Sequence, residues 1–202
     1  MNKQLKIGDV IEIPLPNGKK AFAHYLAKDF WGDLIGVFDY LADINEKINL
    51  EQIETKKFKF PPVFTRIKDG MELSQLFTHF DEIIAAGLSL SEADIKMMSD
   101  KSTNYDWKVV GNIPIKDFTF PKFLWKEGGS HSLAPSMWYL YDGETDITIG
   151  KTIPQKYSDL EYKANYSPTS IVDRILTGEK PQEKLIKQSS SIFYGLLTKI
   201  LK

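Results

Sequence analysis

The amino-acid sequence predicts an α+β domain: a bent, mainly antiparallel small β-sheet or partly open barrel, with flanking helices and a C-terminal amphipathic helix. Three observations lead to this class. The first forty residues alternate apolar and polar side chains between turn signals, residues 71–101 change to a helical period, and the chain after Gly178 carries one apolar stripe. With 202 residues, 42% of them hydrophobic, the chain is long enough to bury a core.

The first forty residues are typical of an antiparallel meander. Residues 8–15 alternate as a half-buried strand does, and they lead into Asn17–Gly18, a dipeptide that accepts positive φ at both central positions of a tight hairpin turn. Residues 20–27 and 34–40 are two further predicted strands, with Gly32–Asp33 as the turn between them. Three antiparallel strands in so short a stretch predict a strongly bent sheet.

The later residues mix helices with strands. Apolar side chains at helical spacing predict the helices, and short runs rich in β-branched and aromatic residues predict the strands. The predicted helices lie near residues 46–54, 71–100 and 170–178. The predicted strands lie at 61–67, at 107–111 and in a hairpin over 136–149 that turns at Asp142–Gly143.

Gly178 marks the predicted boundary between a domain over residues 1–178 and an amphipathic helix over residues 179–202. The helix has one stripe of leucine and isoleucine, with lysines on its other faces. Gly195 inside the helix costs about 1 kcal/mol relative to alanine, so an isolated helix is marginal and needs a covering surface. Docking on the domain is favoured. Pairing with a second copy as a homodimer and lying on a membrane surface stay open, although the dense basic face of a membrane helix is missing.

Composition and charge exclude several function classes. The chain has 26 Lys+Arg and 27 Asp+Glu, a net charge of -1, which argues against direct nucleic-acid binding. It has no cysteine, which excludes disulfides, thiolate nucleophiles and cysteine-containing zinc sites. Residues 1–16 lack the apolar run of a signal peptide, and no segment has the length and hydrophobicity of a membrane span. We therefore expect a cytoplasmic protein without a membrane partner.

No catalytic template finds a complete set of residues. A metal site needs three or four converging ligands, whereas His24, His79 and His131 are far apart in the sequence. No Gly-x-Ser-x-Gly motif is present. Carboxylate pairs such as Asp142 with Glu144 suit a tight turn better than acid–base chemistry. We expect a protein that is not an enzyme and that needs no cofactor or metal.

An acidic stretch is the first candidate binding surface. Residues 69–94 contain six acidic residues and no Lys or Arg, and the candidate contacts within them are Glu72, Asp81 and Glu82. Such a surface would meet a basic partner and speed their association. The alternative explanation is that these carboxylates lie in the first turns or on the solvent faces of helices.

A second acidic group surrounds an aromatic residue in a predicted turn. Its acidic members are Asp29, Asp33, Asp39 and Asp43, and the aromatic residue is Trp31. An exposed tryptophan is the kind of residue that interface hot spots use. Trp31 is equally suited to cap one end of the small sheet, whereas Trp107, Trp125 and Trp138 lie in apolar runs and are expected in the core.

Three stretches of the chain resemble the immunity protein 26 family. They are Lys6–Ala23, Pro62–Phe64 and Trp107–Pro114, and the resemblance covers roughly residues 5–125. It implies a cytosolic immunity protein of a bacterial polymorphic toxin system, which neutralises a toxin delivered by neighbouring cells. The family brings no agreed catalytic residues, so the resemblance transfers none to this chain.

The leading functional prediction is binding of a cognate bacterial toxin, which the protein neutralises by steric occlusion. An inhibitor of this kind needs a rigid scaffold and a few desolvated anchor residues, but no reactive group. If the toxin is a nuclease, its basic groove would attract an acidic surface.

Two alternatives have other requirements. A phosphotriesterase-like phosphoester hydrolase requires the three histidines to converge with a carboxylate such as Asp39. A small β-barrel recognition module for peptide or nucleic acid requires Trp31, Tyr25 and Phe22 to line one exposed groove.

Overall fold

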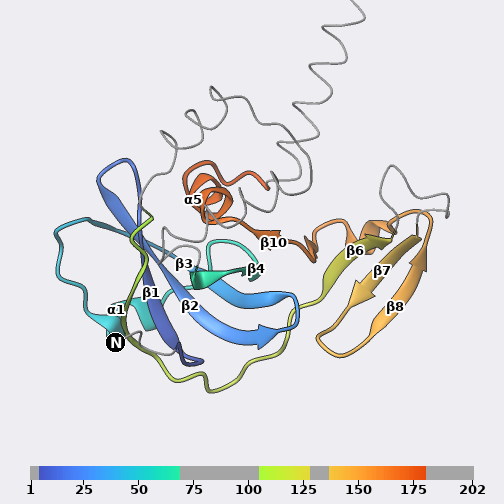
Figure 1. Ribbon diagram of the computed structural model, residues 1–202, viewed down its shortest axis with the longest axis horizontal. Helices are drawn as coiled ribbons and strands as arrows, with labels where there is room; N and C mark the ends of the chain where they lie inside the picture. Colours follow the sequence, from blue (N-terminus) through green and yellow to red (C-terminus); the bar gives the residue numbers. More distant parts are fainter. Residues whose placement is uncertain (1–4, 69–104, 128–136, 181–202) are drawn as a thin grey trace, which may run out of the picture. The chain divides into compact units, whose positions relative to one another are not determined.

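The computed structural model describes residues 5–68, 105–127 and 137–180 (Figure 1). The chain divides into two compact units, residues 1–168 and 169–202. The boundary lies at the start of helix α5 (Pro168–Thr177), whereas the predicted boundary at residue 178 lies after this helix. Within the described ranges, no helix has the length and apolar character needed to cross a membrane.

The first sheet has six strands in the order β10-β4-β3-β2-β1-β5. All neighbours pair antiparallel except β10 and β4, which are parallel. The strands are β1 (Asp9–Pro14), β2 (Lys19–Asp29), β3 (Gly32–Asp43), β4 (Val63–Thr65), β5 (Lys108–Asn112) and β10 (Asn165–Tyr166). The predicted meander of three antiparallel strands is therefore confirmed.

The turn between β1 and β2 differs in detail from the prediction. The Leu15 amide donates to the Lys19 carbonyl at 2.8 Å and closes a loop over residues 16–18. Gly18 has φ +76°, whereas Asn17 is not among the residues with positive φ. The connection is a three-residue loop with one glycine in the left-handed region, and not the tight two-residue turn.

The turn between β2 and β3 lies at Phe30–Trp31, just before the predicted Gly32–Asp33. Gly32 pairs with Asp29, and Asp33 pairs with Lys28. Gly32 and Asp33 therefore belong to β3 and not to the turn. Gly32 has φ +137°, and a Cβ added there would lie 2.8 Å from the Thr65 carbonyl oxygen. Glycine is required here because neighbouring backbone comes close, and not because it forms the turn.

Both faces of the central strands are buried. On β2, Ala21 and Ala23 point to one layer, and Phe22 and His24 point to the other. The prediction of a half-buried strand over residues 8–15 is wrong, because Glu12, which points to the opposite face from the apolar residues of β1, is also buried. Glu12 is buried because its carboxylate pairs with two lysines, Lys20 at 3.1 Å and Lys108 at 3.0 Å.

One apolar cluster lies between this sheet and helix α1 (Leu50–Glu54). The Asn49 side chain caps the helix by accepting a hydrogen bond from the Glu51 amide at 3.0 Å. Leu50 packs against β5 at Gly111, where an added Cβ would lie 2.2 Å from the Leu50 Cδ1 atom. The buried members of the cluster are Val10, Phe22, Phe38, Ala42, Ile53 and Ile113.

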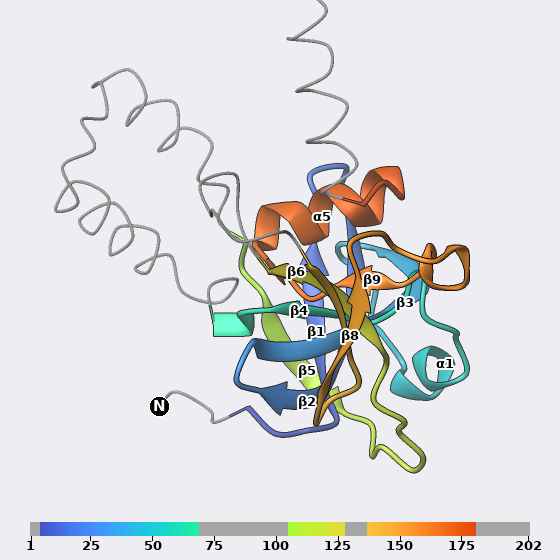
Figure 2. The same ribbon diagram turned by 90° about the vertical axis from the view of Figure 1, so that its right-hand side faces the viewer.

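The second sheet has four strands in the order β8-β7-β6-β9, and it faces the viewer in Figure 2. They are β6 (Phe123–Glu127), β7 (Met137–Tyr141), β8 (Asp146–Gly150) and β9 (Glu161–Tyr162). The predicted hairpin and its turn are confirmed, because β7 pairs antiparallel with β8. The Asp142 carboxylate accepts the amides of Glu144 and Thr145 in this turn, and these bonds lower its pKa.

A second apolar cluster joins the two sheets. Leu26, Leu34 and Phe64 of the first sheet pack with Phe123 and Tyr141 of the second. The rings of Phe64 and Phe123 are 4.8 Å apart, which is close packing for an aromatic pair. The sheets therefore share a core, although among the described strands no ladder of backbone hydrogen bonds joins them.

The described part of the chain is mostly β, with two open and mainly antiparallel sheets and no closed barrel. One bent sheet was expected. Residues 113–122 separate the two sheets and contain Pro114 and Pro121, which have no amide donor for a ladder. A short 3-10 helix, Gln155–Tyr157, lies between β8 and β9.

The predicted helices have different outcomes. α1 is shorter than the predicted 46–54, whereas α5 occupies nearly the predicted residues 170–178. In α5, Ile171, Val172 and Ile175 are buried, and the helix is followed by Gly178 at φ +75°, a common helix stop. The predicted helix at 71–100 and residues 181–202 of the C-terminal helix lie outside the described residues.

Candidate functional site

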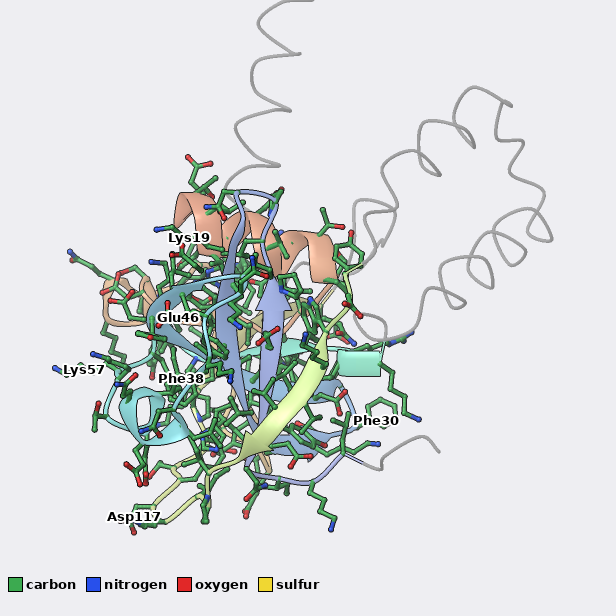
Figure 3. All side chains as sticks on the ribbon, turned by 90° about the vertical axis from the view of Figure 1, so that its left-hand side faces the viewer. Lys19, Phe30, Phe38, Glu46, Lys57 and Asp117 are labelled. Atoms are coloured by element: carbon green, nitrogen blue, oxygen red, sulfur yellow. The ribbon has the colours of Figure 1, made fainter. Side chains whose placement is uncertain are left out.

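The tip of the β2–β3 hairpin is the most exposed apolar feature among the described residues. Phe30 is 94% exposed and Trp31 is 41% exposed, and their rings meet edge to face with centroids 6.0 Å apart. Figure 3 shows Phe30 at one edge of the described part, on the other side from Lys57. A side chain as apolar as phenylalanine gains nothing from full exposure in water. Its position therefore suggests a contact surface.

Trp31 covers a buried lysine. The Lys163 ammonium lies 4.6 Å from the centroid of a Trp31 ring, 5.5 Å from that of Trp125 and 3.4 Å from that of Tyr141. Asp146 completes the group with an ion pair of 3.3 Å, and the Lys163 side chain is 2% exposed. We call these five residues the lysine cage. Cation–π attraction is strongest for such a desolvated ammonium, so the cage holds the Trp31 indole in one orientation.

Two hydrogen bonds attach the hairpin tip to other strands. The Tyr141 hydroxyl donates to Asp29 at 2.6 Å, and the Asn165 side-chain amide donates to the Trp31 carbonyl at 2.9 Å. Burial and the Asp29 carboxylate both raise the pKa of Tyr141, so its hydroxyl keeps its proton at neutral pH. Because Tyr141 also belongs to the lysine cage, the tip is held on both its backbone and its side chains.

Asp33 has a structural role next to the tip. Its carboxylate accepts a hydrogen bond from the Ile67 amide at 3.0 Å. Burial raises the pKa of Tyr25 to about 12, with a further contribution from the Asp33 carboxylate that its hydroxyl contacts. The Asp33 carboxylate therefore stabilises the fold through the Ile67 amide and the Tyr25 hydroxyl.

The structure brings some of the predicted site residues together and not others. Asp29, Trp31 and Asp33 meet at the hairpin tip. Asp39 lies six residues further along β3, about 20 Å at the rise of a strand, and pairs with Lys59 at 3.3 Å. The other three candidates, Glu72, Asp81 and Glu82, lie outside the described residues.

The second sheet contributes an aromatic and acidic surface that the sequence analysis missed. Trp125 stacks on Tyr139 with centroids 4.5 Å apart, and its indole donates to Asp146 at 2.7 Å. The Tyr139 hydroxyl donates to Glu127 at 2.5 Å, a bond that raises the pKa of this tyrosine. The period-two rule places Trp125 on the same face as Phe123 and Glu127. Phe123 is buried in the second apolar cluster, so this face of β6 changes from core to surface along the strand, and Glu127 marks the end that is exposed.

The predicted core tryptophans divide into two groups. Trp107 is buried, as expected. Trp125 and Trp138 are only half-buried. They belong to the second sheet, where Trp125 contacts the edge of the apolar cluster and β6 ends at the exposed residues Lys126 and Glu127. An apolar run alone does not distinguish these two environments.

The residues of the alternative functions are also located. The Nε2 atom of His24 lies 2.8 Å from the Ile113 carbonyl and donates to it, and His79 and His131 lie outside the described residues. Among the residues that the structure describes, no group of three or more potential ligands could hold a metal ion. Phe22 and Tyr25 are buried, so they do not line an exposed groove with Trp31.

Comparison of the chain with protein-family models, with curated proteins and with solved structures finds no match in any of the three.

Proposed function

We propose that this chain is a protein-binding module whose contact surface is centred on the tip of the β2–β3 hairpin. The observation that carries the proposal is the pair Phe30 and Trp31, which is exposed and yet held at a two-residue turn. Binding energy in protein interfaces is concentrated in a few aromatic or arginine anchors. An anchor that is already held in place loses less entropy on binding, which favours affinity.

The chemistry around the tip favours a basic partner. Carboxylates of Asp29, Glu127 and Asp146 lie among the aromatic rings of the hairpin and the second sheet. Exposed indole faces attract ammonium and guanidinium groups, and nearby carboxylates strengthen this attraction. The lysine cage shows that the same residue types accommodate a lysine from this chain. We propose that the partner places lysine or arginine side chains on this surface.

Within this class, we propose that the partner is a bacterial toxin and that the protein is its immunity protein. The resemblance of Lys6–Ala23, Pro62–Phe64 and Trp107–Pro114 to the immunity protein 26 family supports this choice. Inhibition would follow from occlusion of the toxin in the cytoplasm, with no turnover by this chain. A nuclease toxin fits the proposed surface best, because its groove would be basic.

Co-expression tests this proposal. If the neighbouring gene encodes a secreted protein, the full chain is expressed with the terminal domain of that protein, and survival and recovery of a one-to-one complex are scored. Phe30→Ala should weaken the complex about 30-fold, corresponding to about 2 kcal/mol for a central aromatic anchor. Leu41→Ala is the matched control, since Leu41 is also an exposed apolar residue of β3 but lies far from the tip.

Two results would count against the proposal. Absence of both rescue and complex would reject the toxin partner. Equal binding by wild type and Phe30→Ala, with binding lost in Leu41→Ala, would move the contact surface away from the hairpin tip.

A further inference from the structure

A cavity of about 430 Å³ is lined by residues of the first sheet, of helix α1 and of the segments 56–58 and 113–118. Its lining residues Phe38, Lys57 and Asp117 lie on the opposite side from Phe30 in Figure 3. Its apolar wall is formed by Leu26, Phe38, Phe58, Ile113, Ile115 and Phe118. Its volume lies within the range of about 300–1,000 Å³ that small-molecule sites occupy. The proposed protein-binding function does not use this cavity.

Contacts within the fold hold the aromatic wall in place. Phe58 lies against β3 at Gly36, where an added Cβ would be 2.5 Å from the Phe58 ring. A β-bridge joins the backbones of Phe38 and Phe58, and their ring centroids are 5.4 Å apart. The Phe58 ring can lie flat on β3 because Gly36 has no side chain, and the β-bridge to Phe38 fixes its backbone.

His24 closes one part of the cavity as a neutral side chain. Its ring stacks on Phe38 with centroids 5.6 Å apart, and its Nε2 atom donates to the Ile113 carbonyl. Burial lowers the pKa of His24 below its ordinary value of 6.5, although the Ile113 and Gly8 carbonyls oppose the shift. The histidine is neutral at pH 7, so positive charge at the cavity comes from lysines.

Lysines outnumber carboxylates among the charged lining residues. These are Lys56, Lys57 and Lys116, with Glu54 and Asp117 as the two acids. Lys116 pairs with Glu54 at 3.7 Å, and because both side chains are exposed the pair is weak. Lys57 forms no ion pair within the described ranges, and Figure 3 shows it directed outward. The lysines thus leave a net positive charge next to three phenylalanine rings.

We propose that this cavity is a binding site for a small aromatic carboxylate. The ring system of the ligand would lie against Phe38, Phe58 and Phe118, where it gains from stacking and from removal of apolar surface from water. Its carboxylate would lie near Lys57 and Lys116, which supply charge-assisted hydrogen bonds.

Two probes of the same shape test the proposal on the full chain. 2-Naphthoate carries the carboxylate, and 2-naphthamide replaces it with a neutral amide. Isothermal titration at low salt should show saturable binding of 2-naphthoate with a submillimolar Kd and at least fivefold weaker binding of 2-naphthamide. The difference should shrink in 0.5 M salt, because these lysines are at the surface.

Substitutions locate the binding. Lys57→Ala should weaken 2-naphthoate about fivefold and leave 2-naphthamide unchanged, whereas Lys19→Ala removes an exposed lysine that does not line the cavity and should change neither. Ile115→Trp should fill the cavity and abolish binding of both probes, with far-UV circular dichroism as the check on folding. Phe118→Ala, which removes one wall, is the second variant and should weaken both probes.

Three results would overturn the proposal. They are absence of saturable 2-naphthoate binding at millimolar concentration, equal affinity for the two probes, and binding that survives both Ile115→Trp and Phe118→Ala in folded protein.

Discussion

Two buried lysines, one in strand β2 and one in the bend between β9 and β10, are stabilised by different chemistry. Lys20 of β2 pairs with Glu12 of the neighbouring strand and donates to the Glu46 carbonyl at 2.8 Å. Lys163 lies among three aromatic rings, and its carboxylate partner Asp146 is 39% exposed. The first arrangement stabilises the inside of one sheet, whereas the second attaches the hairpin tip to the other sheet. The difference separates residues that maintain the fold from residues that orient the proposed contact surface.

The largest expected effect is a loss of folding stability when the ion pair of Lys20 with Glu12 is broken. Glu12→Ala leaves the buried Lys20 ammonium without its carboxylate, and such uncompensated buried charges typically cost about 3–5 kcal/mol. Urea unfolding should therefore show a strong loss of stability. Lys108→Ala is the control, because Lys108 is 56% exposed and its removal should cost no more than about 1 kcal/mol. Similar losses in the two variants would contradict a buried role for Glu12.

A smaller effect is expected at the lysine cage. Lys163→Met keeps the aliphatic stem but removes the charge, and the Asp146 carboxylate that stays behind is partly solvated. Loss of a desolvated cation–π contact costs about 2 kcal/mol, so the free energy of unfolding should fall less than in Glu12→Ala.

The same variant should also weaken partner binding, because Trp31 loses the contact that orients it. Amide exchange of residues 29–32 should become faster, while exchange in β1 stays as in the wild type. Unchanged exchange at the tip would show that the two hydrogen bonds alone hold it.

The smallest effect is the pH dependence contributed by His24 of the first sheet. The pKa of His24 is lower in the folded chain than its ordinary value of 6.5, so as the pH falls through 6.5 the unfolded chain binds this proton more readily and stability declines. The slope for one group is at most about 1.4 kcal/mol per pH unit. Urea midpoints at pH 7.5, 6.5 and 5.5 should decline less in His24→Gln than in the wild type. Parallel declines would assign the dependence to other groups.

The two turns of the meander show how far the sequence predicts local structure. Asn17–Gly18 correctly placed a hairpin, because glycine is the residue that most readily adopts positive φ. The prediction from Gly32 was wrong. This glycine was expected in a turn, but it lies in β3, where the Thr65 backbone of β4 comes too close for a side chain. Strand existence was therefore predictable, and the exact turn residues depended on a strand far along the chain.

The candidate site was only partly predictable for a related reason. Trp31 and Asp29 were recognisable from an aromatic residue among carboxylates in a turn. Phe30 was overlooked because its exposure follows from the turn position, and Lys163 was overlooked because its cage joins residues from both sheets. The burial of Glu12 was not predicted, because alternation cannot reveal that two lysines lie within 3.1 Å of it.

The amino-acid sequence by itself determined the antiparallel meander, the β7–β8 hairpin and the absence of cysteine chemistry, because these depend on side-chain alternation, turn residues and composition. Only the tertiary structure decided that there are two sheets, that Glu12 and Lys163 are buried, and that Phe30 and Trp31 form a fixed and exposed tip. The physical reason is that local patterns describe neighbours along the chain, whereas burial and pairing of charges depend on residues that only folding brings together.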